Sequence, residues 1–193
     1  MKKHVHKLLG LLLVCLVIFT SCKHKGLPVT DGFVQVVFSS DGICTTYEIP
    51  LELYDALFDD FKFIIKAYNS DKVLSEELFE EKETVIENYW SAIRYPNEKE
   101  LRLLFPSNKV NPLLEKLTNL SDEQHHNLML ALEGMCYCYS YIFAYLEEIA
   151  NIYNGSSTYN SNTELYEAVK EGRFYEMYFS ILKQLFPKIE IKE

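Results

Sequence analysis

The chain has few of the residues from which catalytic centres are built. Glycine occurs only 7 times in 193 residues and never in a cluster, so the sequence offers no phosphate-binding loop. No Gly-x-Ser-x-Gly pattern occurs, and no cysteine has a histidine nearby that would activate it as a nucleophile. The acidic pairs, such as Asp59-Asp60 and Glu147-Glu148, are typical of solvated helix faces. We therefore expect a protein without enzymatic activity and without a cofactor.

Histidine is scarce as well, and this argues against a metal centre. After residue 21 only His24, His125 and His126 remain. Glu123 and His126 have the three-residue spacing of helical di-iron sites, but those sites need the motif twice, with further glutamates. The Cys136–Cys138 pair lies more than two helical turns from His126, so one zinc ion cannot join them. We expect no metal site.

The chain also lacks a surplus of basic residues. It contains 19 lysines and arginines against 28 aspartates and glutamates, for a net charge of −9. The first 21 residues carry Lys2, Lys3 and Lys7 and no acid, so the net charge of the remainder is −12. Such a surface repels nucleic acid, which excludes a nucleic-acid partner. It favours a basic partner, although solubility alone also accounts for it.

The sequence has one strongly apolar run, and this run is short. Residues Leu8 to Phe19 are apolar except for Gly10, and these twelve residues are fewer than the roughly 20 that span a bilayer. A basic segment, residues 1–7, precedes the run, as in a secretory signal peptide. Phe19-Thr20-Ser21-Cys22 follows, a large apolar residue and two small residues before a cysteine. This motif resembles the lipobox of bacterial lipoproteins.

The resemblance implies that a diacylglyceryl group is attached to the sulfur of Cys22 and that the chain is cleaved after Ser21. The expected organisation is a signal peptide (residues 1–21), a lipid-bearing tether (22–31) and one domain (32–193). The partner is then the lipid bilayer, bound through acylated Cys22. Residue 23 is lysine rather than aspartate, which favours the outer membrane over the inner one. The alternative is an ordinary signal peptide with a cysteine at its cleavage site.

Hydrophobic periodicity predicts a mainly α fold, a helical bundle with a small N-terminal β-hairpin. Alternating residues at 33–38 and 43–49 predict two strands, with a turn at Gly42 between them. A third short strand at 188–191 is a weaker expectation. Apolar residues at helical spacing predict helices over residues 50–68, 75–94, 97–106, 111–120, 121–154 and 161–187, the last kinked near Gly172.

The longest predicted helix begins at a capping box, with Ser121 as the cap and Gln124 three residues later. Its apolar seam alternates spacings of four and three, as in a heptad repeat: Leu128, Leu132, Met135, Tyr139, Ile142, Leu146, Ile149 and Tyr153. Aromatic residues at every second position between 137 and 145, four tyrosines and Phe143, favour a strand instead. We predict that residues 137–145 are helical, because the residues on both sides of this segment follow a helical pattern.

Three cysteines remain after Cys22. Cys136 and Cys138 diverge on a helix, so a bond between them is not expected. An oxidising envelope would allow Cys44 to pair with Cys136 or with Cys138. Three buried thiols that serve as small apolar residues are the alternative.

Tyrosine is the one unusual feature of the sequence. Tyr137, Tyr141 and Tyr145 form a stripe along the long helix, and tyrosine is enriched at protein interfaces. We interpret this stripe as a contact with a partner protein, the alternative being that the bundle buries it. The expected function is a non-catalytic protein-binding module, either a scaffold subunit or a toxin-neutralising immunity protein. Capture of a small ligand or glycan at the cell surface is the second hypothesis.

Overall fold

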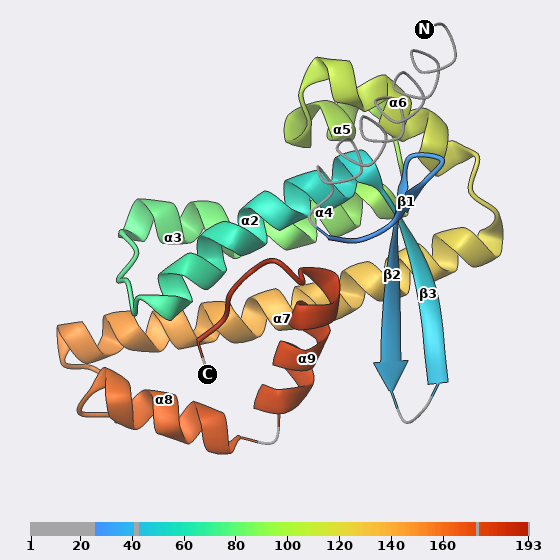
Figure 1. Ribbon diagram of the computed structural model, residues 1–193. Helices are drawn as coiled ribbons and strands as arrows, with labels where there is room; N and C mark the ends of the chain where they lie inside the picture. The colour runs from blue at the N-terminus through green and yellow to red at the C-terminus, as the bar shows by residue number, and fades with distance from the viewer. Residues whose placement is uncertain (1–25, 41–42, 173, 193) are drawn as a thin grey trace, which may run out of the picture.

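The computed structural model describes residues 26–40, 43–172 and 174–192. The fold is mainly helical, with a small three-stranded antiparallel sheet near the start of the chain, as predicted (Figure 1). The predicted signal peptide and Cys22, the predicted site of lipidation, lie outside the described residues. The elements are β1 (Val29–Thr30), β2 (Phe33–Ser40), β3 (Ile43–Pro50), α2 (Leu51–Asn69), α3 (Glu76–Glu83), α4 (Val85–Arg94), α5 (Glu98–Leu104), α6 (Ser107–Thr118), α7 (Asp122–Asn154), α8 (Asn162–Glu171) and α9 (Tyr175–Leu185).

The predicted hairpin forms, and it packs against helices. Val34 lies opposite Ile49, and Val36 opposite Tyr47. Val34, Val36 and Ile49 are fully buried, because these residues point to the one side of the sheet that the helices cover. β1 pairs with the start of β2, so the end of the predicted tether belongs to the domain. The strand expected at 188–191 is wrong, since that segment is irregular.

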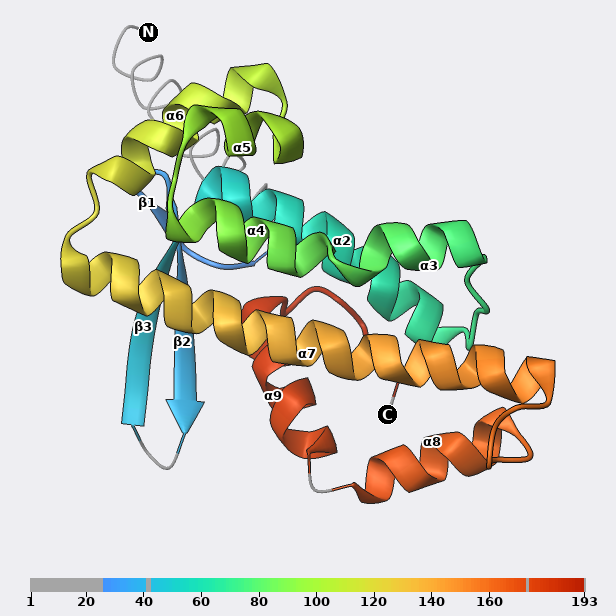
Figure 2. The ribbon, with the colours of Figure 1, turned by 180° about the vertical axis from the view of Figure 1, so that it is seen from behind.

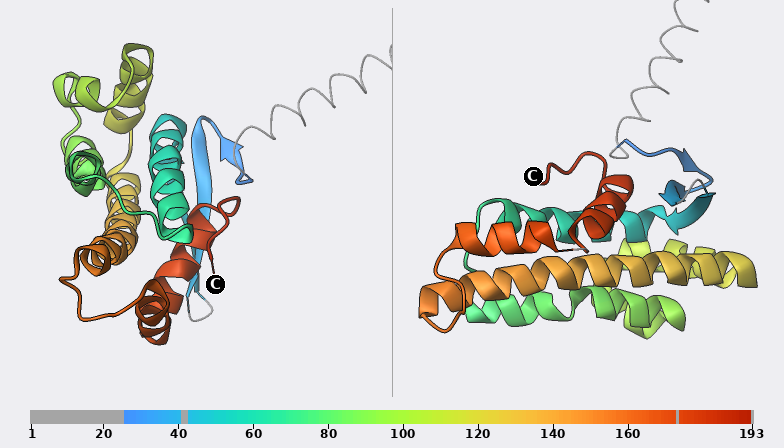
Figure 3. Two further views of the ribbon diagram at one scale, coloured as in Figure 1. Left: turned by 90° about the vertical axis from the view of Figure 1, so that its left-hand side faces the viewer. Right: turned by 90° about the horizontal axis from the view of Figure 1, so that it is seen from below.

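Helix α7 is the axis of the molecule. α2, α4 and α9 all contact it, and α4 and α9 lie on different sides of it (Figures 2 and 3). The predicted capping box is present, and Gly155 ends the helix with a φ of 70°. The predicted seam is buried from Leu128 to Ile149, whereas Tyr153 is exposed. The segment 137–145 is helical, so the flanking pattern outweighed strand propensity.

Three predicted boundaries are wrong, each because tertiary packing overrides the local signal. The helix expected over 75–94 breaks at Thr84, and Phe79 of α3 packs on Phe143 of α7 with ring centroids 4.1 Å apart. α6 begins at Ser107 and tolerates Pro112 inside it, because its apolar face is buried. Gly172 is extended rather than kinked, so α8 and α9 are separate helices.

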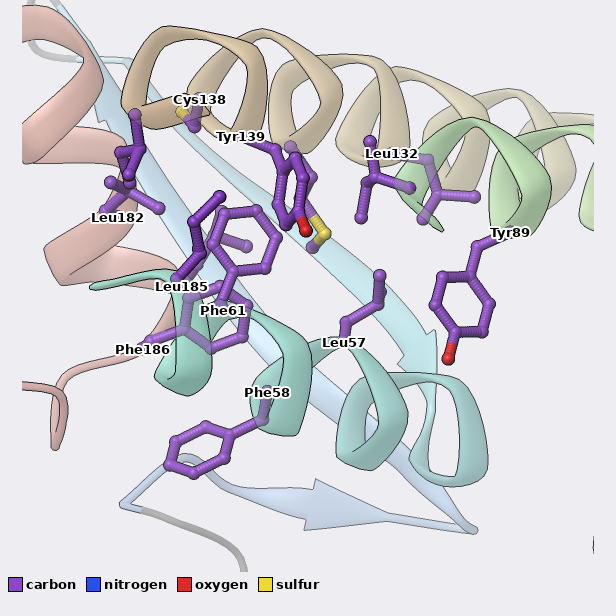
Figure 4. Packing of buried hydrophobic residues seen from close by; sticks show 14 of the residues in the cluster. Leu57, Phe58, Phe61, Tyr89, Leu132, Cys138, Tyr139, Leu182, Leu185 and Phe186 are labelled. Atoms are coloured by element: carbon purple, nitrogen blue, oxygen red, sulfur yellow. The ribbon is translucent and has the colours of Figure 1, made fainter. Parts of the chain in front are cut away.

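The core lies where α2, α7 and α9 meet (Figure 4). Phe61 of α2 is fully buried and packs edge-on against Tyr139 of α7, with ring centroids 5.4 Å apart. Phe186, just after α9, lies 4.8 Å from Phe61. The hydroxyl of Tyr54 donates a hydrogen bond to the carbonyl of Leu185 at 2.8 Å. Aromatic contacts therefore join the start of the domain to its end.

Candidate functional site

The predicted tyrosine stripe is divided among three environments. Tyr137 is 57% exposed. Tyr141 is half-buried against Tyr178 of α9, with ring centroids 4.9 Å apart, and its hydroxyl donates to the carbonyl of Val169. Tyr145 is only 3% exposed and donates a hydrogen bond to Asp71. Residues of α8 and α9 contact Tyr141, and Tyr68 of α2 packs on Tyr145, so Tyr137 is the member of the stripe with an exposed side chain.

An exposed groove lies between α4 and the first half of α7, one turn from Tyr137. It encloses about 480 Å³. Tyr95 at its rim is 70% exposed and Leu130 is 43% exposed. We call this surface the α4–α7 groove; it is lined by Trp90, Arg94, Tyr95, Asp122, His125, His126, Met129, Leu130 and Glu133.

Stacking holds the α4 side of the groove in place. The guanidinium of Arg94 lies 4.8 Å from the Trp90 ring centroid and 5.4 Å from that of Tyr95. Such cation–π contacts fix a flexible arginine at low entropic cost. A ring nitrogen of His125 lies 3.3 Å from the carbonyl oxygen of Ile93, which ties α7 to the end of α4. The groove is therefore preorganised.

The residue types in the groove are those that dominate binding energy at protein interfaces. Tryptophan, tyrosine and arginine are the residues most enriched at hot spots, and methionine is enriched at interfaces as a whole. Asp122 and Glu133 place negative charge at the edges. Trp90 lies in the helix predicted over 75–94, and no spacing rule connects it with His125 and His126, which lie in the helix predicted over 121–154. The sequence feature that could have pointed to this groove was the adjacent pair Arg94-Tyr95, just before Pro96.

The acidic pair Asp59-Asp60 is not simply a solvated face. Asp60 accepts hydrogen bonds from Tyr89 and from Lys82, both at 3.2 Å. Burial and the nearby Asp60 carboxylate raise the pKa of Tyr89 above its ordinary value. The cluster holds α3 and α4 against α2, so these contacts serve packing.

One nucleophile pattern escaped the sequence reasoning. Ser180 and Lys183 on α9 have the Ser-x-x-Lys spacing, and both are exposed. The Ser180 hydroxyl accepts a hydrogen bond from the Gln184 side chain at 3.2 Å. A lysine that acts as a catalytic base is desolvated, whereas the side chain of Lys183 is exposed.

Neither prediction for the cysteines, a disulfide bridge from Cys44 or three buried thiols, agrees fully with the structure. Cys136 and Cys138 carry free thiols, so neither of the predicted bridges to Cys44 is present. Cys138 is buried in the core, Cys136 is half-buried, and Cys44 is exposed on β3. Burial raises the pKa of the Cys136 thiol to about 11 and that of Cys138 to about 12. Both thiols are therefore protonated and poorly reactive at neutral pH.

The described residues contain neither a cluster of metal-ligating side chains nor a helix that could span a membrane. No three acidic, histidine or cysteine side chains there gather closely enough to hold a metal ion. None of the helices in residues 26–192 that the structure describes is both long and apolar enough to cross a bilayer. No family model, curated protein or solved structure matches the chain.

Proposed function

We propose that this protein is a lipid-anchored component of a bacterial cell envelope that binds another protein through the α4–α7 groove. The signal peptide and the lipobox ending in Cys22 support the anchor, on the outer membrane rather than the inner. The composition of the groove supports protein binding. The observation that carries the proposal is the stack of Arg94 on the half-buried Trp90 and the exposed Tyr95, which lines the same groove as Met129 and Leu130.

The groove best fits a protein segment that inserts an apolar side chain and carries basic residues on either side of it. Met129 and Leu130 offer apolar surface at the centre of the groove, whereas Asp122 and Glu133 border it. The chain beyond residue 21 carries a net charge of −12, which steers a basic partner toward it. A scaffold subunit and a toxin-neutralising immunity protein both meet this description.

Glycan capture is the second candidate, because the exposed Tyr95 and the half-buried Trp90 both line the groove. Sugars stack on open aromatic faces, and the guanidinium of Arg94 already covers one face of each ring. The protein partner is therefore favoured.

The groove is tested by Leu130→Glu, which places a charge at its apolar centre. We expect the affinity for the partner captured by the tagged, lipidated protein to fall at least about 30-fold, the cost of a hot spot. Met177→Glu is the matched control, since Met177 is 46% exposed on α9, away from the groove. A partner that binds both variants as tightly as the natural chain would contradict the proposal. Retention on a glycan array that Leu130→Glu abolishes would favour the second candidate.

The anchor is tested by Cys22→Ala. Two or more acyl chains hold a protein stably on a bilayer, whereas a chain without them has no such attachment. We expect the variant to move from the detergent-extracted membrane fraction to the aqueous fraction, measured by immunoblotting after ultracentrifugation. Cys44→Ala, which changes a cysteine within the domain, should stay with the membrane. An unchanged membrane fraction for Cys22→Ala would refute the anchor.

A further inference from the structure

Residues 190–192 are held by side chains, although they form no strand. The Asn69 side chain donates to the carbonyl of Glu190 at 2.7 Å and accepts from the backbone N–H of Lys192 at 2.8 Å. The hydroxyl of Tyr175 donates to the carbonyl of Lys192 at 3.3 Å. These hydrogen bonds involve only backbone groups of residues 190 and 192, so they do not depend on which side chains the segment carries.

The side chain of Lys192 enters a cage of three aromatic rings. Its ammonium nitrogen lies 4.6 Å from the ring centroid of Tyr68 and 4.9 Å from those of Tyr145 and Tyr166. It forms an ion pair with Asp71 and donates to the Tyr145 hydroxyl at 3.0 Å. We call these four residues, Tyr68, Tyr145, Tyr166 and Asp71, the lysine cage.

The cage has the features of a built binding site. The carboxylate of Asp71, a residue with a φ of 47°, forms an ion pair with the ammonium group of Lys192. Tyr145 also donates to Asp71, at 2.6 Å. Tyr68 is fully buried, yet the hydroxyls of Tyr68 and Tyr166 have no hydrogen-bond partner within the described structure. The cage thus contains polar groups that packing alone does not require.

The site is also reachable from solvent. The Lys192 side chain retains 22% exposure. A groove of about 710 Å³ borders it, lined in part by Lys170, Glu176, Phe179 and Ile191. An extended segment other than residues 190–192 can therefore reach the cage once those residues withdraw.

We propose that the lysine cage is a binding site for a lysine side chain carried on an extended segment, and that Lys192 is its intramolecular occupant. Three aromatic faces favour any organic cation. Asp71 and Tyr145 accept N–H donors, so they select a primary ammonium over a quaternary one, which has no proton to donate. A lysine of a second protein then competes with Lys192 for the same cage. This inference does not depend on the α4–α7 groove.

Chemical rescue tests the proposal. Lys192→Ala in the full chain removes the atoms that n-propylammonium carries. We expect n-propylammonium to bind this variant with a Kd on the order of 1 mM by calorimetry. A tenfold excess over Kd should then multiply the folded-to-unfolded ratio by about 11, read as a rise in Tm. The natural chain and Lys188→Ala, in which Lys192 still fills the cage, should not respond.

Three comparisons make the result decisive. 1-Propanol has the same carbon chain without the charge, and tetramethylammonium has the charge without a donor; both should bind Lys192→Ala at least about tenfold more weakly. Asp71→Asn in the same background should reduce n-propylammonium binding. Equal rescue by 1-propanol, or none by n-propylammonium, would overturn the proposal. If Lys192→Ala does not fold, refolding by n-propylammonium but not by 1-propanol supports it, and failure of both refutes it.

Discussion

We expect the free energy of unfolding to fall by about 5–7 kcal/mol between about pH 9 and about pH 11, because five core tyrosines must keep their protons to stay buried. Burial is the main cause that raises the pKa of each of them above the ordinary value. Neighbouring carboxylates add to it at four of them. They are Tyr54, Tyr68, Tyr89, Tyr139 and Tyr145.

The sign follows from proton binding. In the unfolded chain each phenol ionises near pH 10, whereas in the folded protein it stays protonated well above that pH. Above about pH 10 the unfolded state therefore binds fewer protons, and stability falls by up to about 1.4 kcal/mol per tyrosine and pH unit. The contribution is complete below about pH 10 and is lost as the pH rises toward the folded pKa. Since domains have about 5–15 kcal/mol in total, unfolding near pH 11 is expected.

Urea titrations monitored by circular dichroism at several pH values measure this loss. The double variant Tyr68→Phe/Tyr139→Phe is the informative control, because neither hydroxyl has a hydrogen-bond partner in the described structure. It should reduce the alkaline loss by about 3 kcal/mol. Tyr153→Phe, at a 66% exposed position, should leave the loss unchanged. Tyrosinate absorbance from all fourteen tyrosines while the fold remains intact would contradict the prediction.

Phe61→Ala is expected to lower the free energy of unfolding by about 3–5 kcal/mol. Phe61 is fully buried and touches both Tyr139 and Phe186, so the substitution leaves a cavity between α2, α7 and the segment after α9. The lost burial and the cavity contribute together. Urea unfolding at neutral pH should show a lower midpoint with an unchanged slope.

The matched substitution is Tyr153→Ala, which removes an exposed aromatic ring from α7, the helix that also carries Tyr139. We expect a change within about 0.5 kcal/mol. A cost for Phe61→Ala that is no larger than this would mean that the aromatic core contributes little to stability.

The elements that could be predicted from the sequence are those whose signals lie among residues close together along the chain. Ser121 and Gln124 cap α7 because both partners lie within one turn, and the α7 seam follows from spacing alone. No proline or glycine marks the break at Thr84, and the contact of Phe79 with Phe143, a residue distant in sequence, could not be read from local spacing. Pro112 was assigned to a helix start, whereas the burial of Val110 and Leu113 lets the helix run through it.

The candidate sites were predicted less well than the fold, for the same reason. Tyr137 was assigned to a contact surface and lies exposed beside the α4–α7 groove. Tyr145 was assigned to the same surface, but Tyr68, Asp71 and Lys192 pack around it, and these residues lie far from it in sequence. Trp90 and Leu130, or Asp71 and Lys192, come together from distant segments, so no spacing rule connects them.

The contact of β2 with α9 has a consequence for folding that the proposed export would make important. A chain that crosses a membrane from its N-terminal end delivers β2 first and α9 almost last. Until α9 arrives, the apolar face of Val34 and Val36 lacks one of the elements that cover it. Under the export proposed above, this apolar face would therefore be open to contact with other chains between the emergence of β2 and that of α9.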